Sequence, residues 1–72
     1  MTLLELLKRI AHKQKIDLFN ANCTIIALNV ERNEIIDILQ LKFEKNFRNM
    51  INCEIEQIYV EKNLVITLKN SF

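Results

Sequence analysis

The clearest repeating pattern of apolar and polar residues lies at the N-terminus. Thr2 is followed three residues later by Glu5, a spacing typical of a helix capping box. Apolar residues then fill one continuous arc of a helical wheel, while charged residues fill the other arc. The apolar arc consists of Leu3, Leu4, Leu6, Leu7, Ile10 and Ala11. The pattern predicts an amphipathic helix at the start of the chain.

A different pattern occurs near the C-terminus. Residues 58–60 and 64–68 are two β-prone runs separated by the three residues 61–63. In the second run Leu64, Ile66 and Leu68 alternate with Val65 and Thr67, which gives the strand one wholly apolar face. Asn63 ends the connection, and Asn tolerates a positive φ better than most residues. These features predict a β-hairpin that turns at residues 61–63.

The chain also contains an internal similarity. Residues 22–38 align with residues 52–68 at an offset of 30, and seven of the 17 aligned positions are identical. The alignment places residues 31–33 at the same position as the turn at 61–63. It therefore predicts two equivalent hairpins, 23–40 and 53–70, from a duplicated unit. Residues 34–40 would then be a strand, and residues 41–51 a second helix.

Helical spacing supports an alternative for the middle of the chain. Apolar residues between 34 and 47 recur at intervals of three and four, which is typical of one amphipathic helix. The alternative order is α-β-α-β-β with one long central helix. We favour the repeat and the order α-β-β-α-β-β. Residues 1–72 are then a single α+β domain, with a four-stranded, mainly antiparallel sheet and two helices on one face.

Composition limits the classes of function. Half of the 72 residues are apolar and the formal net charge is +1, so the chain should fold. The absence of glycine excludes the usual phosphate-binding loops, in which the backbone must approach a phosphate closely. A domain of this size buries only about 60% of its unfolded surface, and such domains often rely on disulfides, metals or oligomerisation. We expect a homo-oligomer.

Residues suited to catalysis or metal binding are few. His12, Cys23 and Cys53 lack the close spacing of a structural zinc site, and the sequence suggests no orienting group for a nucleophile. We therefore expect no enzymatic activity, no cofactor, no bound metal and reduced cysteines. The N-terminus lacks a signal-peptide pattern, and no apolar run approaches the ~20 residues that span a bilayer. A cytoplasmic protein that does not bind membranes is expected.

The predicted sheet carries apolar residues on both faces. If helices cover one face, the other forms an exposed surface suited to a protein partner. The residues predicted for this interface are Ile35, Leu39, Val65 and Thr67. The sequence thus predicts a small protein–protein interaction module, a homodimer that serves as a regulator, inhibitor or assembly factor. The protein partner is not identified by any residue pattern.

An alternative function uses the polar face of the N-terminal helix. Its basic residues could follow a nucleic-acid backbone. The predicted contacts are Lys8, Arg9, Lys13 and Lys15. Nine acidic residues offset the basic ones, and a solvated helix face explains the same pattern. Nucleic-acid binding is therefore the second hypothesis.

Overall fold

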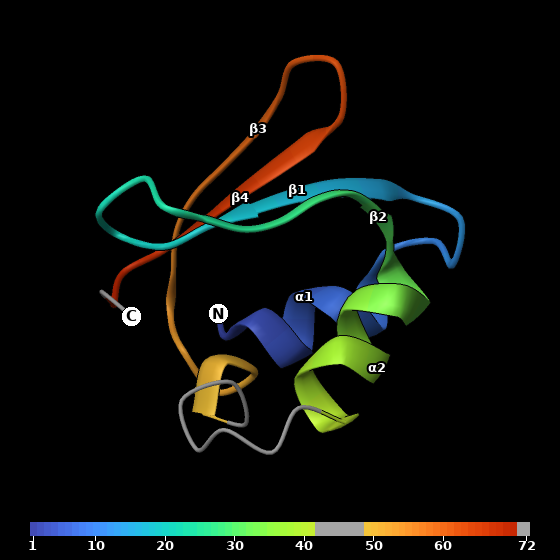
Figure 1. Cartoon of the computed structure of the whole chain (residues 1–72), viewed down its shortest axis with the longest axis horizontal. Helices are drawn as coiled ribbons and strands as arrows, with labels where there is room; N and C mark the ends of the chain where they lie inside the picture. Colours follow the sequence, from blue (N-terminus) through green and yellow to red (C-terminus); the bar gives the residue numbers. More distant parts are fainter. Residues whose placement is uncertain (42–48, 71–72) are drawn as a thin grey trace.

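Two helices pack on one face of a four-stranded sheet (Figure 1). The computed structural model describes residues 1–41 and 49–70. The elements are α1 (Leu3–Arg9), β1 (Lys15–Phe19), β2 (Ile25–Glu31), α2 (Arg32–Leu41), β3 (Ile55–Val60) and β4 (Leu64–Leu68). The predicted α+β class and the order α-β-β-α-β-β are confirmed.

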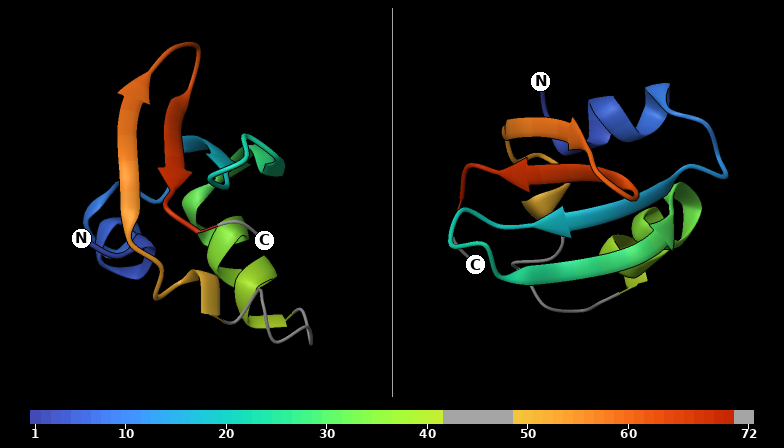
Figure 2. Two further views of the ribbon diagram at one scale, coloured as in Figure 1. Left: turned by 90° about the vertical axis from the view of Figure 1, so that its left-hand side faces the viewer. Right: turned by 90° about the horizontal axis from the view of Figure 1, so that it is seen from above.

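The strands lie in the order β2-β1-β4-β3 (Figure 2). β1 pairs antiparallel with β2, and β3 pairs antiparallel with β4. The two hairpins join through a parallel pairing of β1 with β4 in the centre. The sheet is thus mainly antiparallel, as predicted, and β2 and β3 form its two edges.

The hydrophobic core lies between the sheet and the helices. α1 contributes three leucines, α2 contributes Ile35 and Leu39, and the central strands contribute alternate residues. The buried cluster comprises Leu3, Leu6, Leu7, Ile16, Leu18, Ile35, Leu39, Met50, Cys53, Ile66 and Leu68. We call the sheet face that packs on this core the helix face, and the opposite one the open face.

The capping box at the start of α1 is confirmed. The backbone N–H of Glu5 donates to Thr2 Oγ1 at 3.3 Å, and the backbone N–H of Thr2 donates to Glu5 Oε1 at 3.3 Å. These bonds satisfy two backbone donors that a helix start would otherwise leave without an intrahelical partner. The backbone and hydroxyl of Thr2 both bind the carboxylate, so the pKa of Glu5 lies below its ordinary value of 4.5.

The lowered pKa of Glu5 gives a testable pH dependence. The carboxylate stabilises the fold above pH 4.5, and this contribution is lost as the pH falls through the lower pKa of the folded state. Glu5→Gln should therefore be less stable than the wild type at neutral pH, with the difference shrinking below pH 4.5. Denaturant unfolding at several pH values measures this. Thr2→Ala keeps the backbone donor and should retain part of the pH dependence. If the stability difference between the wild type and Glu5→Gln stays constant with pH, the lowered pKa of Glu5 is contradicted.

The predicted strand at residues 34–40 is wrong, because this segment belongs to α2. The Glu34 carboxylate accepts the backbone N–H of Glu31 at 2.8 Å, which satisfies a donor at the helix start. Ile35 and Leu39, four residues apart, then enter the core on one side of the helix. The helical spacing of the alternative was the better guide here; residues 42–47 of that alternative helix lie outside the described residues.

The strand that the sequence analysis missed is β1. Its buried Ile16 and Leu18 alternate with half-buried Asp17 and Phe19, a period of two. Five residues are a short window, and no similarity within the chain points to them. β1 replaces residues 34–40 as the fourth strand, which is why the element order is right although one strand was misplaced.

The β1–β2 connection turns without glycine. The buried Asn20 side chain accepts the backbone N–H groups of Asn22 and Thr24, each at 3.0 Å. Cys23 in this turn and Asn29 in β2 have positive φ values of 59° and 54°. Asn63 is not among the described residues with positive φ, so that expectation for the β3–β4 turn is wrong.

The two halves of the sequence similarity differ in structure. The predicted hairpin at 53–70 is confirmed, since β3 and β4 flank residues 61–63. Residues 23–40 instead form a turn, β2 and α2. The duplication itself stays a prediction. Most of the predicted helix 41–51 lies outside the described residues; Asn49 and Met50 have helical backbone, and Met50 is buried in the core.

Candidate protein interface

Two of the four predicted interface residues do not lie at the surface. Ile35 and Leu39 project from α2 into the core, and each is only 1% exposed. Their assignment to an exposed sheet face is wrong because they are helical and not strand residues. A partner cannot contact these side chains without unfolding the domain.

The other two predicted residues, Val65 and Thr67, do lie on the open face. They alternate along β4 with Ile66 and Leu68, which enter the core. The register places Val65 between Asp17 of β1 and Tyr59 of β3. Val65 is nevertheless 3% exposed, although neither α1 nor α2 packs on this face, so the neighbouring strands shield it from solvent. Val65 and the half-buried Thr67 offer little apolar surface.

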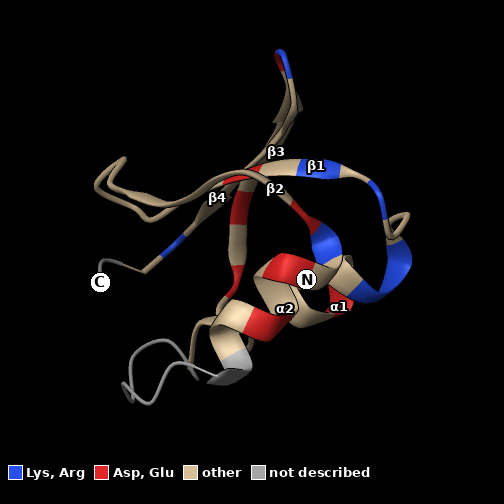
Figure 3. Cartoon of the chain, turned by 45° about the vertical axis from the view of Figure 1, so that its right-hand side comes forward, with Lys and Arg blue, Asp and Glu red and all other residues tan. Residues whose placement is uncertain are grey.

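The four predicted nucleic-acid contacts lie together. Lys8 and Arg9 end α1, Lys13 lies in the following loop and Lys15 begins β1, so basic residues recur along this stretch (Figure 3). All four residues are exposed. Lys15 Nζ lies 3.6 Å from a carboxylate oxygen of Glu31. The four basic residues are therefore interspersed with uncharged ones along residues 8–15, and an acidic residue partly offsets them.

Exposed apolar side chains gather instead on β3. Ile58, Tyr59 and Val60 are consecutive and are 46%, 43% and 74% exposed. The β3–β4 hairpin extends beyond the helices (Figure 1), so Ile58 and Val60, although on the helix face, lie largely outside the core. The sequence shows this apolar run, but it does not show that β3 is an edge strand. Sequence analysis therefore missed these residues.

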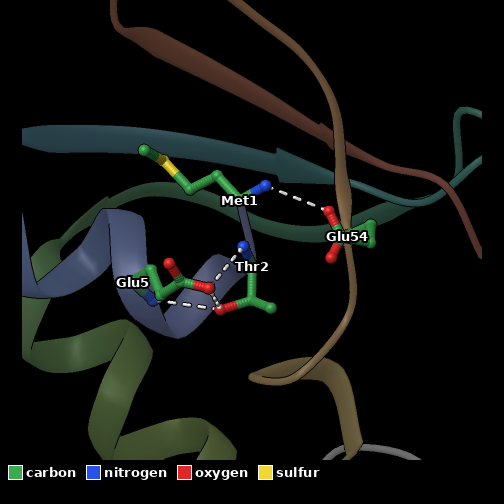
Figure 4. Close-up of polar contacts among 4 residues, drawn as sticks. All are labelled: Met1, Thr2, Glu5 and Glu54. Atoms are coloured by element: carbon green, nitrogen blue, oxygen red, sulfur yellow. Dashed lines mark hydrogen bonds and ion pairs between the residues drawn. The ribbon is translucent and has the colours of Figure 1, made fainter.

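The N-terminus covers the first part of the β3 edge. The backbone N–H of Ile55 donates to the carbonyl of Met1 at 2.9 Å, and Thr2 forms an antiparallel bridge with Glu54. The terminal ammonium of Met1 also lies 3.0 Å from the Glu54 carboxylate (Figure 4). Beyond this point no described residue pairs with the outer side of β3. We call residues 57–60 the open edge.

The hydrogen-bonding direction along the open edge follows from the turn. The N–H of Glu61 donates to the carbonyl of Asn63 at 3.1 Å, so the backbone of Glu61 faces the returning chain. Hydrogen-bonded pairs alternate along antiparallel strands. The register pairs Tyr59 with Val65 two residues back, so we expect these two residues to be the next hydrogen-bonded pair. Ile58 and Val60 consequently direct their backbone N–H and C=O groups away from β4, toward solvent.

The cysteines occupy different environments, and both are free thiols. Cys53 is buried and close to Asn49 and Asn70; its Sγ lies 3.3 Å from the carbonyl oxygen of Asn49. Burial raises the pKa of the Cys53 thiol, which disfavours the nucleophilic thiolate. Cys23 is exposed in the β1–β2 turn. The third candidate for metal or catalytic chemistry, His12, places Nδ1 3.0 Å from Oδ1 of Asn33.

Within residues 1–41 and 49–70, no three His, Cys, Asp or Glu side chains are grouped as a metal site would require. No helix in the same part of the chain combines the length and apolar character needed to cross a membrane. No protein-family model matches the chain, and no curated protein or solved structure shows significant similarity to it.

Proposed function

We propose that this protein is a non-enzymatic protein–protein interaction module that forms a homodimer and serves as a regulator, inhibitor or assembly factor. The observation that carries the proposal is the run of three exposed apolar residues, 58–60, on an edge strand. Long apolar edge strands promote association unless something covers them. The free thiols fit a reducing compartment, and we propose a cytoplasmic location.

The small size of the domain also supports self-association. A core of this size offsets chain entropy only narrowly, and neither cysteine forms a disulfide. A second copy that covers the β3 residues would add burial that one chain lacks. Binding of this kind stabilises the folded state by mass action. The dimer should therefore melt at a temperature that rises with protein concentration.

Val60→Lys tests the proposal because it places a charge on the most exposed of the three apolar residues. We expect the variant to fold and its dimer dissociation constant to rise at least about tenfold, because a central apolar contact is replaced by a solvated charge. Sedimentation velocity across a concentration series measures association, and circular dichroism confirms folding.

Leu28→Lys is the matched control. Leu28 lies on β2, at the other edge of the sheet, and at 47% exposed is comparable to Ile58. This variant should associate like the wild type. A wild-type protein that stays monomeric at high micromolar concentration, with a melting temperature independent of concentration, would contradict the proposed homodimer.

A nucleic-acid-binding accessory protein is the second candidate, favoured by the exposed basic stretch at residues 8–15. Replacing Lys8, Arg9, Lys13 and Lys15 with Glu should abolish binding to short RNA or DNA. The wild-type affinity should fall steeply with salt, since phosphate contacts release counterions. Fluorescence anisotropy with labelled oligonucleotides measures both effects. No binding at low salt, or binding insensitive to salt, would count against this function.

A further inference from the structure

We infer that two copies join edge to edge through antiparallel pairing of their β3 strands, with Tyr59 of each copy on the two-fold axis. Two four-stranded sheets thereby become one eight-stranded sheet. This inference rests on the proposed function, since it specifies the partner as a second copy of the chain and fixes the contact. Three features of the open edge support it: hydrogen-bonding direction, the extent of the free backbone, and the apolar side chains that would face each other.

The hydrogen-bonding direction limits the register. Ile58 and Val60 direct their backbone groups outward, while Tyr59 bonds inward to β4. When two strands pair across a two-fold axis, a residue whose backbone N–H and C=O point outward must lie opposite a residue of the other copy whose backbone groups also point outward. Registers centred on residue 58, 59 or 60 satisfy this condition. Registers centred between two residues would match an outward-facing residue with an inward-facing one.

The N-terminus excludes one of the three registers. Centring on Ile58 would bring residues 61–62 of the second copy against residues 54–55. That part of the edge is already occupied, because Met1 accepts the N–H of Ile55 and Thr2 bridges Glu54. Centring on residue 59 pairs residues 57–61 of the two copies and stops short of the covered segment.

Side-chain pairing selects between the two remaining registers. Centring on Tyr59 places Ile58 opposite Val60 of the second copy, twice by symmetry. Both residues are exposed and apolar, and apolar residues that face each other across a strand pair are favourable. Centring on Val60 would instead place Lys62 opposite the apolar Ile58 and Glu61 opposite Tyr59.

The β2 edge does not offer the same regular backbone. Its pairing with β1 contains two register shifts, and Asn29 within it has a positive φ of 54°. Bulges and irregularities of this kind interrupt the alternating donors and acceptors that a second strand needs. In β3 the single register shift lies between Ile55 and Gln57, so residues 57–60 of the open edge are regular.

Disulfide cross-linking tests the register. Tyr59 would face Tyr59 of the second copy as a non-hydrogen-bonded pair, with Cα atoms about 4.5 Å apart, a separation that a disulfide spans. In a Cys23→Ala background, which removes the exposed native thiol, Tyr59→Cys should form a covalent dimer rapidly under mild oxidation. Gln57→Cys is the matched control. In this register, residue 57 of one copy would lie four residues, roughly 13 Å, along the strand from residue 57 of the other copy. This variant should therefore not cross-link.

Charge introduction tests the facing residues 58 and 60. Ile58→Glu and Val60→Lys should each weaken dimerisation roughly tenfold, because each places a charge opposite an apolar residue twice by symmetry. The double variant Ile58→Glu/Val60→Lys places opposite charges face to face and should dimerise at least about threefold more tightly than either single variant. Sedimentation equilibrium at low salt measures all four proteins.

The outcomes separate the inference from the proposed function. Selective cross-linking at residue 59 together with rescue by the double variant supports the β3 dimer. A wild type that dimerises while either signature is absent overturns this register and leaves the interaction module standing. A wild type that stays monomeric throughout overturns both the inference and the homodimer.

Discussion

Leu39→Lys is expected to leave no folded protein under native conditions. Leu39 is 1% exposed and belongs to the core cluster between α2 and the sheet. A lysine there would lose the apolar contacts and bury an unpaired ammonium group, and each loss costs several kcal/mol. The whole stability of a 72-residue domain is only about 4–11 kcal/mol. Far-UV circular dichroism and a denaturant titration measure the result.

The comparison with Val60→Lys makes this test specific. Both substitutions introduce lysine in place of an aliphatic residue, one in the core and one on the open edge. Val60→Lys should keep the circular dichroism spectrum of the wild type. A folded Leu39→Lys with wild-type stability would show that α2 does not pack as the structure has it. It would also revive the sequence-based hypothesis that Leu39 lies on an exposed sheet face.

The sequence predicted those elements whose signals are local. The α1 capping box and its leucines are decided within a few residues, and so is the alternation of Leu64, Ile66 and Leu68 in β4. The signals that predict a hairpin are also local, because only a short connection separates its two strands. The α+β class and the hairpin at 53–70 were therefore predictable, whereas the element order was right only because the missed β1 takes the place of the strand predicted at 34–40.

Residues 34–40 show where local signals conflict. An isoleucine-rich run suits both a strand and a buried helix face, and the similarity to residues 64–70 favoured the strand. The outcome depends on contacts from elsewhere in the chain. Arg32 Nη1 donates to the carbonyl of Ile10 at 3.3 Å, and Asn33 contacts His12, so the start of α2 is held against the loop after α1. None of these partners could be inferred from a repeat of 17 residues.

The candidate interface was predictable only in part, for a related reason. Strand order decides which residues lie at an edge, and it is a property of the whole sheet. The parallel pairing of β1 with β4 places β3 at the edge and exposes residues 58–60. Val65 and Thr67 were placed correctly on the open face because alternation along β4 is local. Their low exposure results from neighbouring strands that the sequence could not position.

Asn20→Ala is expected to destabilise the domain by about 2–3 kcal/mol. Asn20 is buried, and its Oδ1 accepts the N–H groups of Asn22 and Thr24. Alanine would leave both donors without this acceptor and create a small void beside the turn. In a chain without glycine, the Asn20 side chain is what organises the reversal from β1 to β2. The melting temperature should fall by roughly 10–20 °C.

Asn22→Ala provides the control, since Asn22 is exposed and contributes its backbone N–H to the turn. That substitution should change stability by less than about 0.5 kcal/mol. Thermal and urea unfolding of both variants at one fixed concentration removes any effect of dimerisation. Equal losses for the two asparagines would show that the turn depends on asparagine content in general. A loss confined to Asn20 would establish that one buried amide organises the turn from β1 to β2.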